Sequence, residues 1–123
     1  MSPATSRAYT TCAAARLTGT TLRKFDYWVR QGLLRPEKGK RGYVFREGDL
    51  RMARVVQALR ERKCPYATIW CAFSRLEDGA TGYLAVFSGG RRVVYCADGA
   101  SLLGLAKMAA GPLTVVEMPA GAV

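Results

Sequence analysis

The feature that most limits the possible folds is a pair of short helical patterns separated by a turn of about three residues. The first covers residues 11–17, can be capped by Thr10, and includes three consecutive alanines, which favour a helix. The second follows Thr20 and Thr21, either of which can cap it. Its expected buried face comprises Leu22, Phe25, Trp28 and Val29. Glycines at 19 and 32 suit the left-handed backbone that ends a helix, so the pattern predicts a helix-turn-helix.

The next elements extend this pattern into a domain. Extended residues flank a basic, glycine-rich turn between positions 35 and 45, which predicts a β-hairpin, or wing. A helix from about Glu47 to Arg62 follows, and Pro65 opens a fourth helix that we expect to close at Asp78-Gly79. The apolar stripe expected on the fourth helix is Tyr66, Ile69, Trp70, Phe73 and Leu76.

From residue 81 the pattern changes to short strands. Residues 83–87 and 92–96 predict two strands around a tight turn, a short helix follows Asp98 or Ser101, and residues 113–118 predict a third strand. This ββαβ unit is too small for an independent core, so it should pack on the helical half or on a second copy of itself. The fold class is therefore α+β: a tail (1–9), a winged helix-turn-helix of four helices and a hairpin (10–78), and a small ββαβ unit (79–123).

The positive charge is concentrated in one half of the chain. Residues 1–63 contain fifteen Lys and Arg against five Asp and Glu, whereas residues 64–123 contain four of each. The formal net charge of +10 therefore belongs to the first half. A basic half beside a neutral one predicts binding to a polyanion, and to nucleic acid above all.

Other function classes find little support. The chain has no histidine, no paired carboxylates and no glycine-rich phosphate loop, so we expect neither enzyme activity nor a cofactor. Cys12, Cys64, Cys71 and Cys96 lack the spacing of a metal site and should be reduced, mostly buried thiols. No apolar run is long enough to span a membrane and residues 1–10 lack a secretory signal, so we expect a cytoplasmic, nucleoid-associated protein.

The N-terminal half also carries a family resemblance. The residues concerned are Tyr9-Thr10, Ala15-Arg16-Leu17-Thr18-Gly19, Leu22-Arg23, Tyr27-Trp28, Gly32-Leu33-Leu34-Arg35-Pro36 and Gly42-Tyr43 with Phe45. Over about residues 9–69 the chain resembles the N-terminal domain of the MerR family of transcriptional regulators. The resemblance implies a transcriptional regulator that binds double-stranded DNA, and it implies that Arg41 and Tyr43 hold backbone phosphates beside the wing.

The candidate DNA-binding residues lie in the expected recognition helix and wing. Arg23 can donate two hydrogen bonds to the acceptors of a guanine, and Lys24 can reach a base or a phosphate. Thr21 lies at a helix start, which favours phosphate binding. Lys38 and Lys40 can straddle a phosphate backbone or enter a minor groove. The full predicted set is Thr10, Thr20, Thr21, Arg23, Lys24, Tyr27, Arg30, Lys38, Lys40, Arg41 and Tyr43.

The chain departs from the family at several points. Asp26 stands where a basic residue is usual and can either orient Arg30 or repel a phosphate. Arg46 stands where a Ser or Thr would cap the next helix, and Thr11 replaces an apolar residue. The long dimerisation helix and effector module of full-length members are replaced by the ββαβ unit. We expect this unit to form a homodimer or to bind a partner, and its exposed strand edges favour the homodimer.

Two alternative functions stay open. An architectural factor of the excisionase kind would use a similar winged domain to bend DNA for recombination. An antitoxin or adaptor would use the neutral half to bind another protein and would bind DNA only weakly. The basic recognition helix and wing favour the regulator over the adaptor.

Overall fold

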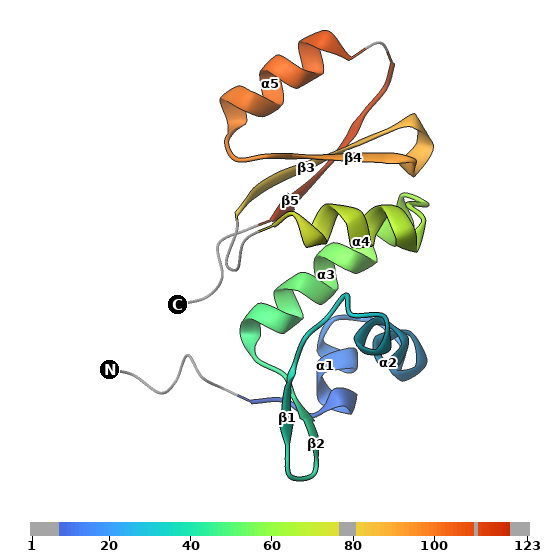
Figure 1. Cartoon of the computed structure of the whole chain (residues 1–123), viewed down its shortest axis with the longest axis vertical. Coiled ribbons are helices and arrows are strands. Elements are labelled where there is room, and N and C mark those ends of the chain that lie inside the picture. Colours follow the sequence, from blue (N-terminus) through green and yellow to red (C-terminus); the bar gives the residue numbers. More distant parts are fainter. Residues whose placement is uncertain (1–7, 77–80, 110, 119–123) are drawn as a thin grey trace, which may run out of the picture. The chain divides into compact units, whose positions relative to one another are not determined.

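The computed structural model describes residues 8–76, 81–109 and 111–118, and within these ranges the chain is a mixture of helices and short strands (Figure 1). The helices are α1 (Thr11–Leu17), α2 (Leu22–Arg30), α3 (Glu47–Glu61), α4 (Tyr66–Ser74), α5 (Gly99–Met108) and the 3₁₀ turn η2 (Ser88–Gly90). The strands are β1 (Glu37–Gly39), β2 (Gly42–Val44), β3 (Gly82–Phe87), β4 (Arg92–Cys96) and β5 (Thr114–Met118).

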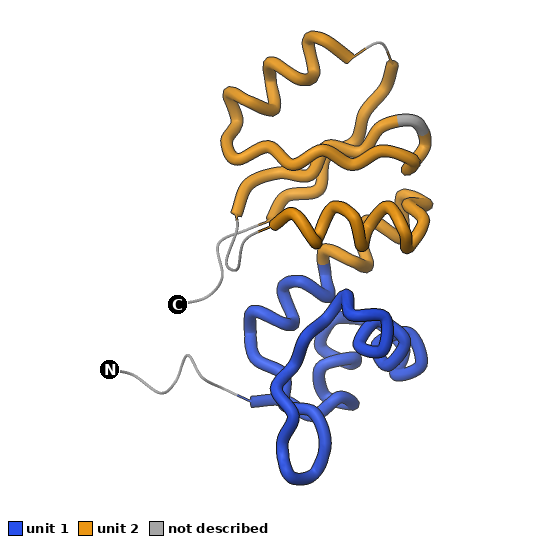
Figure 2. Tube along the Cα trace, viewed as in Figure 1, with its two compact units in different colours: residues 1–54, 121–123 blue, residues 55–120 orange. Residues whose placement is uncertain are grey.

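The chain divides into two compact units, one built on residues 1–54 with 121–123 and one on residues 55–120 (Figure 2). The division falls inside α3, earlier in the chain than the boundary expected near residue 78. The assignment of residues 10–78 and 79–123 to separate functional domains stays a prediction. None of the described helices is long and apolar enough to cross a membrane.

The residues predicted to begin and end α1 and α2 do so in the structure. The hydroxyl of Thr10 accepts a hydrogen bond from the amide of Ala13 at 3.1 Å, and that of Thr21 accepts one from Lys24 at 3.2 Å. Gly19 and Gly32 adopt left-handed conformations with φ of 72° and 79° directly after the two helices. The two threonine hydroxyls give partners to backbone amides at the helix starts, and the two glycines allow the chain to turn where the helices end. α1 and α2 therefore form the predicted helix-turn-helix.

The core of the first unit is aromatic. Phe25 and Trp28 of α2 and Phe45 after β2 are fully buried, and the Phe25 ring meets the Phe45 ring edge-on with centroids 5.0 Å apart. Leu22, in contrast, is 49% exposed, so its predicted place on the buried face was wrong. Leu22 is the first residue of α2, and a helical spacing alone does not show where the covered part of a helix face ends.

The hairpin is anchored to a third short segment of the first unit. β1 and β2 pair antiparallel with Lys38 opposite Tyr43, and Lys40-Arg41 form the two-residue turn. Beyond β2, the amide of Tyr9 donates to the carbonyl of Phe45 at 2.8 Å and the amide of Phe45 donates back at 3.0 Å. The Tyr9 hydroxyl also bonds to the Glu47 carboxylate, which ties this bridge to the start of α3.

The second unit contains the predicted ββαβ elements in the predicted order. Its sheet has the strand order β4-β3-β5, with both neighbours antiparallel to β3. Helix α4 packs beside β4, and α5 contacts β3 and β4 from the other side of the sheet (Figure 1). The buried sheet residues are Leu84, Ala85, Val86, Cys96, Val116 and Met118. None of the residues of α5 is buried, so this helix covers its face of the sheet only partly.

Some burial expectations for α4 and for the cysteines were wrong. Trp70, on the expected apolar stripe of α4, is 50% exposed, while Ile69 is fully buried. Of the cysteines, Cys64 and Cys96 are buried but Cys12 and Cys71 are exposed. Cys71 therefore lies on a face of α4 that the core does not cover. The expected helix end at Asp78-Gly79 lies outside the described residues, and α4 itself ends at Ser74.

Gly90 marks a close approach between the β3–β4 turn and the connection from α3 to α4. Its φ is 101°, and a Cβ placed there would lie 2.7 Å from the carbonyl oxygen of Arg62 and 2.8 Å from that of Lys63. We expect Gly90→Ala to lower the free energy of unfolding by about 2 kcal/mol, because it adds backbone strain and a contact that only backbone movement can relieve. Chemical denaturation measures this.

Gly89 provides the matched control for that substitution. It also has a positive φ, 65°, but a Cβ there would meet nothing within 4 Å. Gly89→Ala should therefore cost only the conformational term of about 1 kcal/mol. Equal losses for the two variants would show that the close approach at Gly90 contributes nothing.

Candidate nucleic-acid interface

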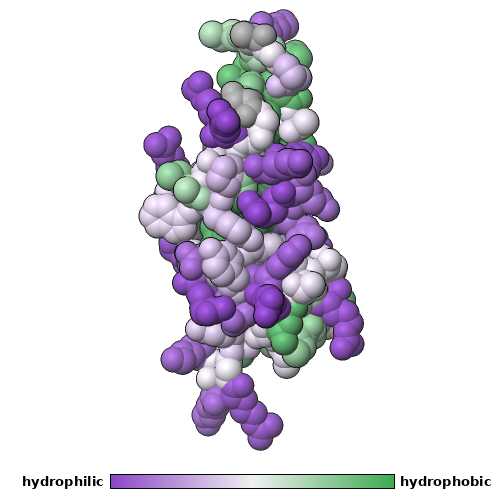
Figure 3. Space-filling view, turned by 90° about the vertical axis from the view of Figure 1, so that its right-hand side faces the viewer, coloured by the Kyte–Doolittle hydropathy of each residue, from purple (hydrophilic) through white to green (hydrophobic). Residues whose placement is uncertain are grey.

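The predicted DNA-binding residues all lie in the first unit, and all but Thr20 are exposed. They come from three places: the start of α1, helix α2 with its cap, and the hairpin β1–β2. In the surface view of Figure 3, hydrophilic side chains gather at the lower end, where the turn of the hairpin lies.

The start of α2 combines two kinds of positive potential. Arg23 and Lys24 are exposed on the first turn, and that turn contains no acidic side chain. The N-terminal end of a helix carries a partial positive charge, which adds to the charges of these side chains. Thr21 caps the helix and is itself exposed, so an anion approaching this end meets a hydroxyl and two cations.

Farther along α2, Arg30 is paired rather than free. Its Nε lies 3.2 Å from the Oδ2 of Asp26, one helical turn earlier, and both side chains are more than half exposed. Of the two roles considered for Asp26, the structure therefore contains the one in which it orients Arg30. An exposed pair of this kind contributes only about 0.3–0.5 kcal/mol, so a phosphate can compete for the guanidinium.

The hairpin is held against the inner side of α2 through aromatic rings. Tyr43 is 42% exposed, and its ring lies edge-on to Phe45 with centroids 6.4 Å apart. Phe45 in turn contacts Phe25 of α2. This chain of rings places the base of the hairpin on α2, while Lys38, Lys40 and Arg41 remain exposed.

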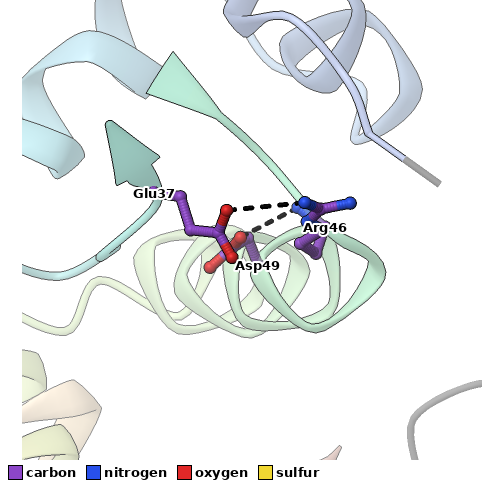
Figure 4. Close-up of polar contacts among 3 residues, drawn as sticks. All are labelled: Glu37, Arg46 and Asp49. Carbon is purple, nitrogen blue, oxygen red and sulfur yellow. Dashed lines mark hydrogen bonds and ion pairs between the residues drawn. The ribbon is translucent and has the colours of Figure 1, made fainter. Parts of the chain in front are cut away.

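A polar network fixes the other side of the hairpin (Figure 4). The Arg46 guanidinium lies 3.4 Å from the Glu37 carboxylate of β1, and the Arg46 amide donates to Asp49 Oδ2 at 2.9 Å. Asp49, the third residue of α3, thus bonds back to the amide that precedes the helix, which is the reciprocal half of a capping box. Burial raises the pKa of Asp49 above its ordinary value, although the hydrogen bond from the Arg46 amide acts in the opposite direction.

Thr20 differs from the other predicted residues. Its hydroxyl oxygen is buried, and it has no hydrogen-bond partner among the residues that the structure describes. The neighbouring Thr21, not Thr20, caps α2. The Thr20 hydroxyl is therefore not presented on the exposed face that carries Thr21 and Arg23.

Some exposed basic residues of the first unit were not in the predicted set. Arg16 on α1 and Arg35 after α2 are exposed, and neither has a carboxylate partner within the described ranges. The charge count of the first half includes both, but neither belongs to the recognition-helix or wing pattern. Their exposure and their place in the same unit make them further candidates.

A family profile decides what kind of domain this is. The profile described as MerR HTH family regulatory protein matches residues 9–70, half of the chain. The chain belongs to the MerR family. The match covers the same segment as the resemblance seen at Tyr9 to Ile69, and in this MerR chain it includes α1, α2, the hairpin, α3 and the start of α4.

A solved structure agrees with this family assignment at the level of fold. It is the crystal structure of HiNmlR, described as a MerR family regulator lacking the sensor domain, bound to promoter DNA. The two chains are 24% identical with a TM-score of 0.50, and the match covers 53% of this chain and 51% of the other. The MerR chain described here thus spans about half the length of that relative. No curated protein sequence matches the chain significantly.

Proposed function

We propose that this chain is a transcriptional regulator that binds double-stranded DNA in a sequence-specific manner through α2 and the hairpin. The observation that carries the proposal is that exposed cations lie on two elements, α2 and the hairpin, joined by the Phe25–Phe45 contact. One of those elements is a helix, which the major groove admits, and the other is a basic turn. The DNA-bound MerR relative supports the same use of the fold.

The proposed roles divide between base reading and phosphate binding. Arg23, on the first turn of α2, contacts base edges in the major groove, where its forked donors match the two acceptors of guanine. Lys24 and the capped helix end at Thr21 bind phosphate. Lys38, Lys40 and Arg41 extend the phosphate contacts from the hairpin, and Thr10, Tyr27, Arg30 and Tyr43 complete the set. No cofactor and no catalytic step is required.

We further propose that the protein acts as a homodimer through the second unit, in the cytoplasm and on the nucleoid. This proposal draws support from apolar side chains exposed there, of which Met108 is 84% exposed and Leu103 and Val115 are also exposed. β4 and β5 form the two edges of the described sheet, and open strand edges favour association. Sedimentation of the free protein tests the proposed dimer.

Selection of bound sequences from random duplex DNA tests the proposed DNA binding. A symmetric dimer should recover two half-sites in inverted orientation, because the symmetry of the site follows that of the protein. Tandem direct repeats would instead indicate an architectural factor of the excisionase kind. Failure to enrich any sequence, with only weak binding to all duplexes, would contradict the proposed function and favour an adaptor.

The hairpin makes a separate prediction about salt. We expect Lys40→Ala to weaken binding to all duplexes alike and to reduce the slope of log affinity against log salt by about one unit, because one phosphate contact is lost. Titration of the selected duplex and of an unrelated duplex at several salt concentrations measures this. A loss confined to the selected duplex would mean that Lys40 reads bases, contrary to its proposed role.

A further inference from the structure

A groove in the second unit lies between α4 and the edge strand β4. Its volume is about 670 Å³, and it is lined by Ala67, Thr68, Cys71, Ala72, Arg75, Arg91, Arg92, Val93, Val94 and Tyr95. All these residues belong to one compact unit, and α4 and β4 lie side by side in it (Figure 1). Sites for small molecules in proteins have volumes of about 300–1,000 Å³, so the groove has the size of such a site.

The charge of this groove is of one sign. Arg75 follows the last turn of α4, Arg91 directly precedes β4, and Arg92 is the first residue of β4. The lining contains no Asp or Glu, and none of the three arginines forms an ion pair among the described residues. Three arginines from α4 and β4 therefore border one space, although Arg92 also lines a second hollow beside α5. No carboxylate of the described residues lines the groove, an arrangement that suits a carboxylate, sulfonate or phosphate.

The rest of the lining is apolar or held in place. Ala67 and Ala72 have small side chains that leave room beside α4, and Val93 and Val94 are half-buried. The Tyr95 hydroxyl donates to the carbonyl of Thr81 at 2.6 Å, which holds its ring in position. β4 also lies at one edge of the described sheet, so its outer backbone groups have no neighbouring strand there to pair with. An apolar ligand body can pack on these walls while its anionic group meets the arginines.

We propose that this groove binds a small organic anion with an apolar body. The combination of three arginines and an apolar wall matches such a molecule in charge and in surface. The limited volume favours it over a nucleic-acid backbone, which needs a long basic track. The proposal concerns the second unit alone and does not depend on DNA binding by the first.

The aromatic sulfonate 1-anilinonaphthalene-8-sulfonate is a suitable probe for this site. We expect the intact protein to bind one equivalent, and Arg75→Gln and Arg91→Gln each to raise the dissociation constant about tenfold, because each removes a charge-assisted contact. Lys107→Gln is the matched control, since Lys107 is an exposed cation of the same unit outside the groove. The uncharged analogue N-phenyl-1-naphthylamine should bind at least about tenfold more weakly.

The cysteines provide a second readout that reports position. Cys71 lines the groove and Cys12 lies on α1, and both are exposed. Saturating probe should slow the reaction of Cys71 with iodoacetamide at least about fivefold by covering it and leave the rate at Cys12 unchanged. Peptide mass spectrometry separates the two sites.

Three results would overturn the proposal. One is equal probe affinity in the arginine variants, the Lys107 variant and the parent protein. Another is protection of neither cysteine or of both equally. The third is displacement of the probe by short duplex DNA with the arginine variants losing DNA affinity, which would assign the groove to a nucleic-acid surface instead. Thermal unfolding of each variant confirms that exposed Arg→Gln changes leave the fold intact.

Discussion

Replacement of Phe25 by alanine is expected to lower the free energy of unfolding by about 3–5 kcal/mol, the largest effect of any single change considered. Phe25 is fully buried, and its ring contacts both Trp28 and Phe45, with centroids 6.0 Å and 5.0 Å away. Removing it leaves a cavity between α2 and the base of the hairpin. Since domains of this size have about 5–15 kcal/mol of stability in total, chemical denaturation should detect a severe loss.

Leu22→Ala is the control for that substitution. Leu22 lies on the same helix and is also apolar, but it is half-exposed, so its truncation removes little buried surface. We expect it to change stability by less than about 1 kcal/mol. A comparable loss in both variants would contradict the assignment of Phe25 as the contact that joins recognition helix and hairpin.

Replacement of Arg23 by alanine is expected to cost about 1–3 kcal/mol of binding free energy at one base position of the selected DNA site. Arg23 is exposed on the first turn of α2. In the proposed interface, a side chain at this place reaches base edges while the helix end meets phosphate. The variant should keep its affinity for unrelated duplexes, so the specificity ratio falls. Competition binding against a panel of single base-pair changes measures this.

A control variant separates this effect from a general loss of charge. Lys107→Ala removes one positive charge from the second unit and should leave the base preferences unchanged. If Arg23→Ala instead weakened all duplexes equally, Arg23 would be a phosphate contact, and the base-reading role would have to pass to another residue of α2. Unaltered binding in the Arg23 variant would contradict the proposed interface.

Much of the first unit could be predicted because its signals are local. The caps at Thr10 and Thr21 form hydrogen bonds three residues along the chain. The left-handed glycines 19 and 32 end the helices through their own backbone preference. The strands of the second unit could be predicted equally well, because alternating apolar residues on both sides of a glycine turn indicate strands without information about distant residues.

The exposure of individual side chains could not be predicted in the same way. Leu22 and Trp70 both fit an apolar helical spacing, yet each is about half-exposed, at 49% and 50%. The Thr20 hydroxyl, expected at a DNA interface, is buried. Asp26 had two possible roles, and its pairing with Arg30 required the geometry of the folded helix. Each outcome depends on which residues distant in sequence cover that position.

The groove between α4 and β4 is the clearest example of a feature that the sequence could not predict. Arg75 and Arg91 are far apart in the chain and belong to no common motif, so no spacing connects them. By itself the sequence determined the family, the order of the elements and the basic character of the first unit, because these follow from short-range hydrogen bonds, backbone preferences and charge. Only the tertiary structure decided which of those side chains share a surface, because that depends on the packing of elements that the chain brings together from a distance.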